Sequence, residues 1–381
     1  MTEPTVTVDL GALRHNLQVL RARLRPGVQL LAAVKADAYG HGARATVPAL
    51  ERAGADAFGV ASATEALALR EWGVTATILV FAPVRERIAE LVEAGVALTV
   101  ADASSLEAIE RAGAQGPAQV HLKIDTGMGR LGEKPEAAGG LARRIARSPQ
   151  LEFAALWTHL ACADEPDAHD PQGLTERQLT RFEGAVAALR VDALAPPLVH
   201  AANSAATLGL PRAHYDLVRP GIALYGHHAT PAAGALLPPG VPPLRPVATL
   251  RAPVTFVKRV SRGTPVSYGA TWQAPRDTVI ATLRLGYADG YPRAAGNQAE
   301  ALVHGVRVPV VGRVCMDQLM LDVGALGGDV AVGDEATLFG PEGPCLGALA
   351  ARLDTISYEL LTHLQAPRLE RTYVDTSPPP S

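Results

Sequence analysis

The stretch Val28-Gln-Leu-Leu-Ala-Ala-Val-Lys35-Ala-Asp-Ala-Tyr39-Gly-His-Gly42 joins a short apolar run to a lysine, a tyrosine and two glycines. The run is β-branched at both ends and follows a Pro-Gly pair, which predicts a buried strand that ends close to Lys35. Apolar surroundings disfavour the charged form of a lysine, and the neutral amine can form a Schiff base with a carbonyl. The chain has only four lysines among its 35 basic residues, so lysine is not used as general solubilising surface. A solvated lysine just past a strand is the alternative interpretation.

Short apolar runs recur along the next two hundred residues or so, and segments rich in Ala, Leu, Arg and Glu with helical spacing separate them. Eight strands that alternate with helices are typical of a (β/α)8 barrel, an α/β fold whose chemistry lies at the carboxyl ends of the strands. A doubly wound open sheet is the alternative, but the glycine-rich phosphate turn that a dinucleotide fold needs is missing. The expected barrel strands cover residues 28–35, 57–62, 77–82, 97–101, 119–125, 151–159, 197–203 and 216–225. The expected helices cover residues 11–25, 43–53, 64–72, 85–94, 104–112, 135–147 and 174–190, and Asp9 is placed to cap the first of them.

A second domain is predicted after residues 227–246, which interrupt the rhythm with six prolines and several glycines and have the composition of a linker. Beyond the linker the apolar runs alternate with turn residues, which favours a mostly β domain. The expected strands are 254–260, 279–285, 301–311 and 318–323, followed by a helix around 346–364 and a strand at 368–374. A lone strand is expected at residues 5–8, and residues 377–381 are expected to be disordered.

The composition excludes several classes of function. A formal net charge of −3 with 19% charged residues gives no reason to expect nucleic acid or another polyanion as a partner. Three cysteines without paired spacing predict neither a disulfide framework nor a zinc site, and His227-His228 has no Cys or carboxylate at ligand spacing, so no metal is expected. No apolar run approaches about 18 uninterrupted residues, and the N-terminus does not have the pattern of a signal peptide. We expect a cytoplasmic protein that does not enter a membrane.

Polar residues at the ends of the expected barrel strands converge on one mouth. A group with a carbonyl, an aromatic ring and a phosphate would use Lys35 for an imine, and Tyr39 and His159 for ring contacts. The loops after the seventh and eighth strands commonly hold phosphate in such barrels, and Ser204 begins a helix whose free N–H groups attract anions. Pyridoxal 5′-phosphate (PLP) is the cofactor that matches this set. The residues at the mouth are Lys35, Tyr39, Lys123 to Arg130, His159, Asn203, Ser204 and Arg219 to Ile222.

The motifs resemble those of the alanine racemase family. Val34-Lys-Ala-Asp-Ala-Tyr-Gly-His-Gly42 is similar to the family's PLP-lysine signature, and six further motifs follow in the family's order. The resemblance implies a PLP-binding barrel at residues 9–240, a β domain at 241–381 that the initial strand at 1–8 joins, and a head-to-tail homodimer with shared active sites. The six motifs are Lys123-Ile-Asp-Thr-Gly-Met-Gly-Arg130, Arg219-Pro-Gly-Ile-Ala-Leu-Tyr-Gly226, Val266-Ser-Tyr268-Gly-Ala-Thr271, Gly286-Tyr-Ala-Asp-Gly-Tyr-Pro-Arg293, Gly312-Arg-Val-Cys-Met316-Asp317-Gln318 and Ile356-Ser-Tyr358-Glu359.

The resemblance also implies a role for each matching residue. Lys35 binds PLP and is the base on one face of the substrate α-carbon, and Tyr268 of the partner subunit is the base on the other face. Two bases are needed because a single group would return the proton to the face it came from. Arg219 faces the pyridine nitrogen and, as a poor proton donor, leaves it unprotonated.

Further roles follow from the same resemblance. Arg130 contacts the substrate carboxylate, and Lys123 matches a position that is carbamylated in many members; an unmodified lysine paired with an acid is the alternative for Lys123. His159 is the hydrogen-bond partner of the catalytic tyrosine. The other implied cofactor contacts are Tyr39, Asn203, Ser204, Gly221, Ile222 and Tyr358, and the other substrate contacts are the Met316 main chain and Asp317, both from the second subunit.

Three alternative functions fit parts of the sequence. A PLP decarboxylase of similar architecture would place a carboxylate at the pyridine nitrogen and a cysteine opposite, and Arg219 and Tyr268 argue against it. A non-enzymatic PLP carrier would leave the second domain unexplained. A broader-specificity or serine racemase differs only in its pocket. Alanine is favoured as the substrate because the motifs are closest to that branch, and the resemblance alone implies the supply of D-alanine for peptidoglycan.

Overall fold

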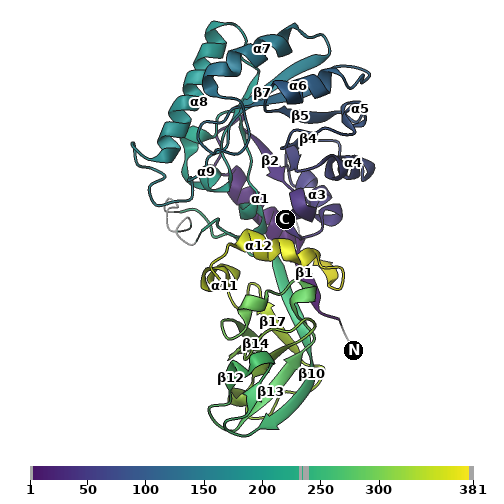
Figure 1. Cartoon of the computed structure of the whole chain (residues 1–381), viewed down its shortest axis with the longest axis vertical. Helices are drawn as coiled ribbons and strands as arrows, with labels where there is room; N and C mark the ends of the chain where they lie inside the picture. The colour runs from purple at the N-terminus through teal and green to yellow at the C-terminus, as the bar shows by residue number, and fades with distance from the viewer. Residues whose placement is uncertain (1–2, 231–233, 235–239, 377–381) are drawn as a thin grey trace.

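The chain forms a barrel domain and a β domain, which Figure 1 shows one above the other. The computed structural model describes residues 3–230, 234 and 240–376 of the chain. Part of the expected linker and the expected disordered tail at 377–381 lie outside these residues. None of the helices in the described part of the chain has the length and hydrophobicity that a membrane crossing needs. The division of the chain at residues 8/9 and 240/241 stays a prediction.

The barrel sheet has eight parallel strands in the order β8-β7-β6-β5-β4-β3-β2-β9, so the last strand lies beside the first. This confirms the expected α/β fold with a (β/α)8 barrel, and the barrel is nearly closed. The eighth strand is shorter than the predicted range 216–225, because Pro220 has no N–H to donate to a ladder and the chain then forms a 3-10 turn, η3 (Ile222–Tyr225). The strands are β2 (Gln29–Ala33), β3 (Ala57–Val60), β4 (Thr77–Val80), β5 (Val96–Val100), β6 (Ala118–Lys123), β7 (Leu151–Trp157), β8 (Leu198–His200) and β9 (Leu217–Val218).

Helices cover the outside of the barrel, as the alternating pattern predicts. The Asp9 carboxylate caps the first helix and accepts hydrogen bonds from the main-chain N–H of Gly11 at 2.8 Å and of Ala12 at 3.1 Å, which confirms the predicted cap. That helix ends at Arg21 and not near residue 25, because the chain turns at Pro26-Gly27 to enter β2. The helices are α1 (Leu10–Arg21), α3 (Ala43–Arg52), α4 (Ala63–Glu71), α5 (Ile88–Glu93), α6 (Ala103–Glu110), α7 (Ala138–Arg147), α8 (Leu174–Val191) and α9 (Ser204–Gly209), with 3-10 turns η1 (Pro135–Ala137) and η2 (Pro211–Ala213).

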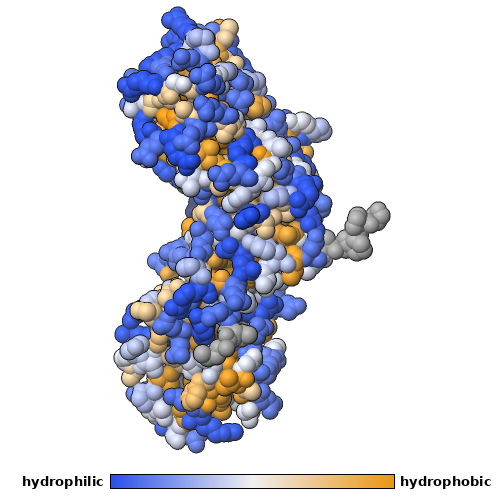
Figure 2. All heavy atoms as spheres, turned by 90° about the vertical axis from the view of Figure 1, so that its right-hand side faces the viewer, coloured by the Kyte–Doolittle hydropathy of each residue, from blue (hydrophilic) through white to orange (hydrophobic). Residues whose placement is uncertain are grey.

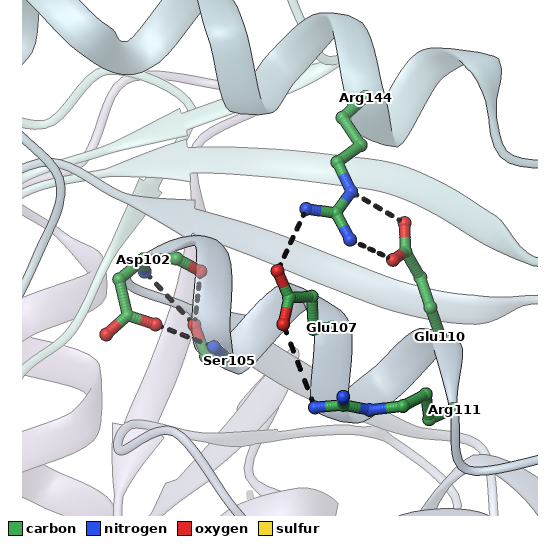
Figure 3. A network of polar contacts seen from close by, with 6 residues as sticks. All are labelled: Asp102, Ser105, Glu107, Glu110, Arg111 and Arg144. Atoms are coloured by element: carbon green, nitrogen blue, oxygen red, sulfur yellow. Dashed lines mark hydrogen bonds and ion pairs between the residues drawn. The ribbon is translucent and has the colours of Figure 1, made fainter.

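A cap closes the start of α6, and an ion-pair network joins α6 to α7 (Figure 3). The Asp102 carboxylate accepts a hydrogen bond from the Ser105 N–H at 2.6 Å, and the Ser105 hydroxyl accepts one from the Asp102 N–H at 3.0 Å. Arg144 of α7 donates to Glu110 at 3.1 Å and pairs with Glu107 at 3.6 Å. The cap satisfies main-chain donors at the helix start, whereas the ion pairs lie in solvent.

Asp102→Ala is expected to lower the free energy of unfolding by about 1 kcal/mol, because it leaves the main-chain N–H of Ser105 at the start of α6 without its acceptor. Arg144→Ala is expected to cost less than about 1 kcal/mol, because its carboxylate partners are already hydrated. Urea denaturation of both variants measures the difference. A larger loss for Arg144→Ala than for Asp102→Ala would contradict this ranking.

The β domain is a sheet in the order β15-β14-β17-β10-β1-β18, and β13 pairs with both β10 and β16. The initial strand β1 (Thr5–Asp9) lies antiparallel to β10 and parallel to β18. The chain therefore begins in the β domain before it enters the barrel. The other strands are β10 (Ala248–Val260), β11 (Pro265–Val266), β12 (Trp272–Gln273), β13 (Thr278–Leu283), β14 (Glu300–Val303), β15 (Val306–Pro309), β16 (Leu319–Asp322), β17 (Glu335–Phe339) and β18 (Glu370–Val374).

Two expectations for the β domain are wrong in detail. The strand predicted at 301–311 is the hairpin β14 and β15, which turns at His304-Gly305 with positive φ at both residues. The helix predicted at 346–364 is two helices, because Asp354 has a φ of 53° between them. These are α11 (Leu346–Arg352) and α12 (Ser357–Thr362), followed by η8 (His363–Gln365); the other 3-10 turns are η4 (Tyr268–Ala270), η5 (Tyr287–Asp289), η6 (Arg293–Ala295) and η7 (Gly324–Leu326).

Candidate active site

The carboxyl ends of the barrel strands surround a pocket of roughly 640 Å³. Side chains from the ends of β2, β6, β7, β8 and β9 reach it, and α12 of the β domain supplies Tyr358. Eleven of the sequence-predicted residues therefore meet in one place. They are Lys35, Tyr39, Lys123, Arg130, His159, Asn203, Ser204, Arg219, Gly221, Ile222 and Tyr358.

Lys35 begins a short turn, α2 (Lys35–Tyr39), that winds in the left-handed sense. Ala36, Asp37 and Ala38 have φ and ψ near +50°, and Tyr39 has a φ of 53°. Each non-glycine residue in this region costs about 1–2 kcal/mol. The chain therefore bends sharply as it leaves β2, and other contacts must stabilise the bend.

The electrostatic surroundings of Lys35 favour the neutral amine. Burial lowers the pKa of Lys35, the positive charge of Arg130 lowers it further, and the carboxylate of Glu65 opposes the shift. A lysine with a lowered pKa supplies more free amine at neutral pH, which suits a nucleophile or a general base.

Arg219 lies fully inside the protein, directly after β9. One guanidinium nitrogen donates to His200 Nδ1 at 2.7 Å, and the other donates to the carbonyl oxygens of Thr158 at 2.8 Å and Ala201 at 3.0 Å. Burial lowers the pKa of Arg219 to about 9, so the group still carries its charge at neutral pH. The nearby His159 Nδ1 is 3.4 Å from the same guanidinium.

The two histidines behind and beside Arg219 are neutral. Burial and the charge of Arg219 hold the pKa values of His159 and His200 well below the usual range. His200 accepts from Arg219 at Nδ1, so its proton lies on Nε2, which is 3.1 Å from His121 Nδ1. This buried chain fixes the orientation of the guanidinium at the base of the pocket.

Lys123 lies against an indole ring at the end of β6. Its Nζ is 3.9 Å from the centroid of the Trp157 ring, and the Arg219 guanidinium carbon is 4.8 Å from the same ring. Burial first, and then the charges of Arg219 and Arg130, lower the pKa of Lys123 to about 7. The lowered pKa therefore favours the neutral amine far more than in an exposed lysine.

The loops after β8 and β9 form a cradle of polar groups. The Ser204 hydroxyl accepts hydrogen bonds from the main-chain N–H of Gly221 at 2.8 Å and of Ala223 at 3.3 Å, and Asn203 caps α9 through Ala206 N at 3.1 Å. A Cβ on Gly221 would lie 2.4 Å from the Tyr39 hydroxyl oxygen. Only glycine leaves this space open, and the hydroxyls and N–H groups around it suit an anion such as a phosphate.

Three sequence-predicted residues lie outside the pocket. Tyr268 is in η4, next to β12 in the β domain, and its side chain is 71% exposed. Met316 is 53% exposed, and Asp317 forms an ion pair with Arg368 at 2.7 Å. Figure 1 shows β12 in the lower lobe and the barrel strands in the upper lobe. One chain therefore does not bring Tyr268 to Lys35.

The chain matches family models over both domains. The model of the alanine racemase N-terminal domain matches residues 8–229, and that of the alanine racemase C-terminal domain matches residues 247–373. The chain belongs to the alanine racemase family. An alanine racemase of Chlorobaculum tepidum is 44% identical over 93% of this chain and 91% of its own length, and one of Nostoc sp. is 40% identical over 93% and 92%. A solved alanine racemase from Streptomyces lavendulae has a TM-score of 0.90 at 36% identity, over 98% of this chain and 97% of that one.

The comparisons confirm the fold class and the expectation of an enzyme of the alanine racemase family, an isomerase. Three further residues lie next to the site although none of the family motifs contains them: Glu65, Trp157 and His200. The Ser62-x-x-Glu65 spacing is that of a capping box, which places Glu65 at the end of β3 beside Lys35. Trp157 and His200 are paired across β7 and β8, so only knowledge of the strand register would have brought them together.

Proposed function

We propose that the chain interconverts L-alanine and D-alanine with PLP as cofactor, and that Lys35 and Tyr268 of the partner subunit are the two bases. Family membership supports the reaction. The observation that carries the assignment of the site is the pocket in which a lysine of lowered pKa, a charged buried arginine and an anion cradle converge. A cytoplasmic location and the supply of D-alanine for peptidoglycan are parts of the same proposal and rest on the family resemblance.

The residues of the pocket fit PLP in size and in chemistry. PLP, when bound, would supply an electron-withdrawing group that makes the α-hydrogen of the substrate acidic. The phosphate would be held by Asn203, Ser204, Tyr358 and the main chain of Gly221 and Ile222, and the ring would be contacted by Tyr39 and His159. Lys35 would hold the carbonyl end, and Arg219 would face the ring nitrogen.

Lys35 would exchange a proton with one face of the α-carbon. Its amine is partly buried, and its lowered pKa increases the share of the free base that can accept a proton. Arg130 would pair with the substrate carboxylate. Its positive charge lowers the pKa values of Lys35 and Lys123, so its guanidinium lies close to both amines in the pocket. These residues orient one enantiomer against the lysine, but they supply no base on the opposite face.

The opposite face needs a second chain. Tyr268, Met316, Tyr287 and Ile356 are exposed large apolar residues of the β domain, and clusters of such residues mark association surfaces. On the face that Figure 2 draws, the lower lobe, where the β domain lies, exposes hydrophobic residues among hydrophilic ones. In a head-to-tail dimer, the β domain of each subunit would cover the barrel mouth of the other, and Tyr268 of the partner subunit would face Lys35.

Lys123 is expected to carry a carbamate, because carbamate formation needs a neutral amine and burial lowers the pKa of this lysine to about 7. The anion would then pair with Arg130 and Arg219. After incubation with ¹³C-bicarbonate, the carbon NMR spectrum should contain a carbamate signal at pH 8 that falls as the pH drops below about 7. Lys123→Ala is the control and should lack the signal. A wild-type spectrum without it would favour the unmodified lysine.

A racemisation assay across alanine, serine, lysine and arginine tests the proposed function. We expect alanine to have the highest kcat/KM. Comparable rates with the larger amino acids would indicate a broader-specificity racemase. Binding of PLP without interconversion of alanine enantiomers would support the carrier function and contradict the proposal.

A further inference from the structure

The strained turn that carries Lys35 is held by contacts from both domains. Four consecutive residues, Ala36, Asp37, Ala38 and Tyr39, have φ between 51° and 55°. L-amino acids avoid this region, and none of the four is glycine. Such a backbone persists only where its surroundings determine it from several sides.

On the barrel side, two carboxylates fix the turn. One oxygen of Glu65 accepts from the Ala36 N–H at 2.7 Å, and the other accepts from the Ala61 N–H at 2.7 Å. This ties the turn to the end of β3. The Asp37 carboxylate accepts from the Ala43 N–H at 2.7 Å, which ties the turn to the start of α3.

On the other side, the β domain lies against the turn. Arg371 of β18 donates to the second oxygen of Asp37 at 3.1 Å and to the carbonyl oxygen of Leu364 at 3.1 Å. A Cβ on Gly40 would lie 2.1 Å from the carbonyl oxygen of Leu361 in α12. The pair Arg371–Asp37 therefore joins residues 334 positions apart in the sequence, at a place where the two domains touch.

We propose that Arg371 is a positioning residue for Lys35: through Asp37, it makes the β domain hold the left-handed turn that aims the lysine into the pocket. The inference rests on the proposed role of Lys35. In this role Arg371 does more than join the two domains. Loss of its ion pair with Asp37 should change the position of the Lys35 amine as well as the contact surface between the domains, which we call the seam. The turn would relax toward ordinary backbone angles and carry the amine away from the cofactor carbonyl.

Arg371→Met tests the proposal. We expect the affinity of the apoprotein for PLP to fall by about tenfold or more, and kcat to fall more than KM rises, because a displaced amine loses its alignment. Visible circular dichroism of the bound cofactor should also change. Arg371→Lys, which keeps the charge, should recover part of the affinity. Asp37→Asn keeps an oxygen for Ala43 and removes the charge, and it should reproduce Arg371→Met.

Arg14→Met is the matched control. Arg14 of α1 pairs with Asp375 at 2.5 Å, one residue after β18, so it crosses the same seam without touching the lysine turn. We expect this variant to lower thermal stability and to leave PLP affinity unchanged. An equal loss of PLP affinity in Arg14→Met and Arg371→Met would overturn the proposal, because both would then act through the seam.

A second substitution, to glycine, tests whether strain in the turn causes the loss of PLP affinity. Glycine adopts positive φ without steric cost, so Ala36→Gly in the Arg371→Met background should return PLP affinity toward the wild-type value. Lost affinity that this glycine does not recover would overturn the proposal, and so would an Arg371→Met enzyme with unchanged affinity. Failure of the proposed function would appear separately, as a wild-type protein that binds PLP and does not racemise alanine.

Discussion

Tyr268→Phe is expected to slow racemisation in both directions by roughly 10²–10⁴-fold, because it would remove the proposed base on one face of the α-carbon. The two enantiomers have equal free energies, so kcat/KM must fall equally in both directions. Exchange of the α-hydrogen with solvent should separate the faces: one enantiomer should still exchange through Lys35, and the other should not. Polarimetry and proton NMR in deuterated water measure the two effects.

Tyr215→Phe is a suitable control for this experiment. Tyr215 lies on the barrel, where its hydroxyl donates to Glu183 at 3.1 Å, so its loss should leave racemisation unchanged. Undiminished racemisation in Tyr268→Phe would refute the role of Tyr268. Loss of exchange for both enantiomers would show that the tyrosine acts on cofactor or substrate binding and not as one of two bases.

Arg219→Glu is expected to lower racemisation by roughly 100-fold and to raise amino transfer to the cofactor, measured as pyruvate. A guanidinium that faced the pyridine nitrogen of PLP would leave it unprotonated, whereas a carboxylate there would keep it protonated and make the ring a stronger electron sink. The proton would then return more often to the cofactor than to the α-carbon of the substrate, which is the route to pyruvate. Burial lowers the pKa of Arg219 only to about 9, so the wild-type residue remains a cation at neutral pH.

Arg219→Lys separates charge from packing. It keeps the positive charge but loses the fork that reaches His200 and the carbonyl oxygens of Thr158 and Ala201. We expect lower activity without an increase in the ratio of pyruvate to racemised alanine. A similar ratio in wild type and Arg219→Glu would contradict the role assigned to the arginine.

The sequence predicts the barrel well, because its strands are buried on both faces and appear as continuous apolar runs. It also predicts eleven lining residues of the pocket, since chemistry in this fold gathers where parallel strands end. The eighth strand was predicted too long, because the apolar residues after Pro220 belong to a 3-10 turn inside the core. An apolar run alone does not distinguish a buried turn from a strand.

The left-handed turn α2 has no counterpart in the sequence. Ala36, Asp37 and Ala38 are not residues that favour positive φ as glycine does, and the contacts that impose it come from Glu65 and from Arg371. Asp354, where the predicted helix divides, and His304, where the predicted strand turns into a hairpin, are also non-glycine residues with positive φ, but these are local turns within apolar segments. The pattern of neighbouring residues in the sequence cannot predict a backbone conformation, such as that of α2, that distant contacts impose.

Subunit mixing tests the central claim most directly, because Lys35 and Tyr268 would belong to different subunits in each active site. Lys35→Ala and Tyr268→Phe should each be inactive alone. After subunit exchange, a hybrid dimer would have one site with both changes and one site with neither, and random mixing should recover about a quarter of the wild-type rate. A mixture that forms hybrid dimers and stays inactive would contradict the shared site.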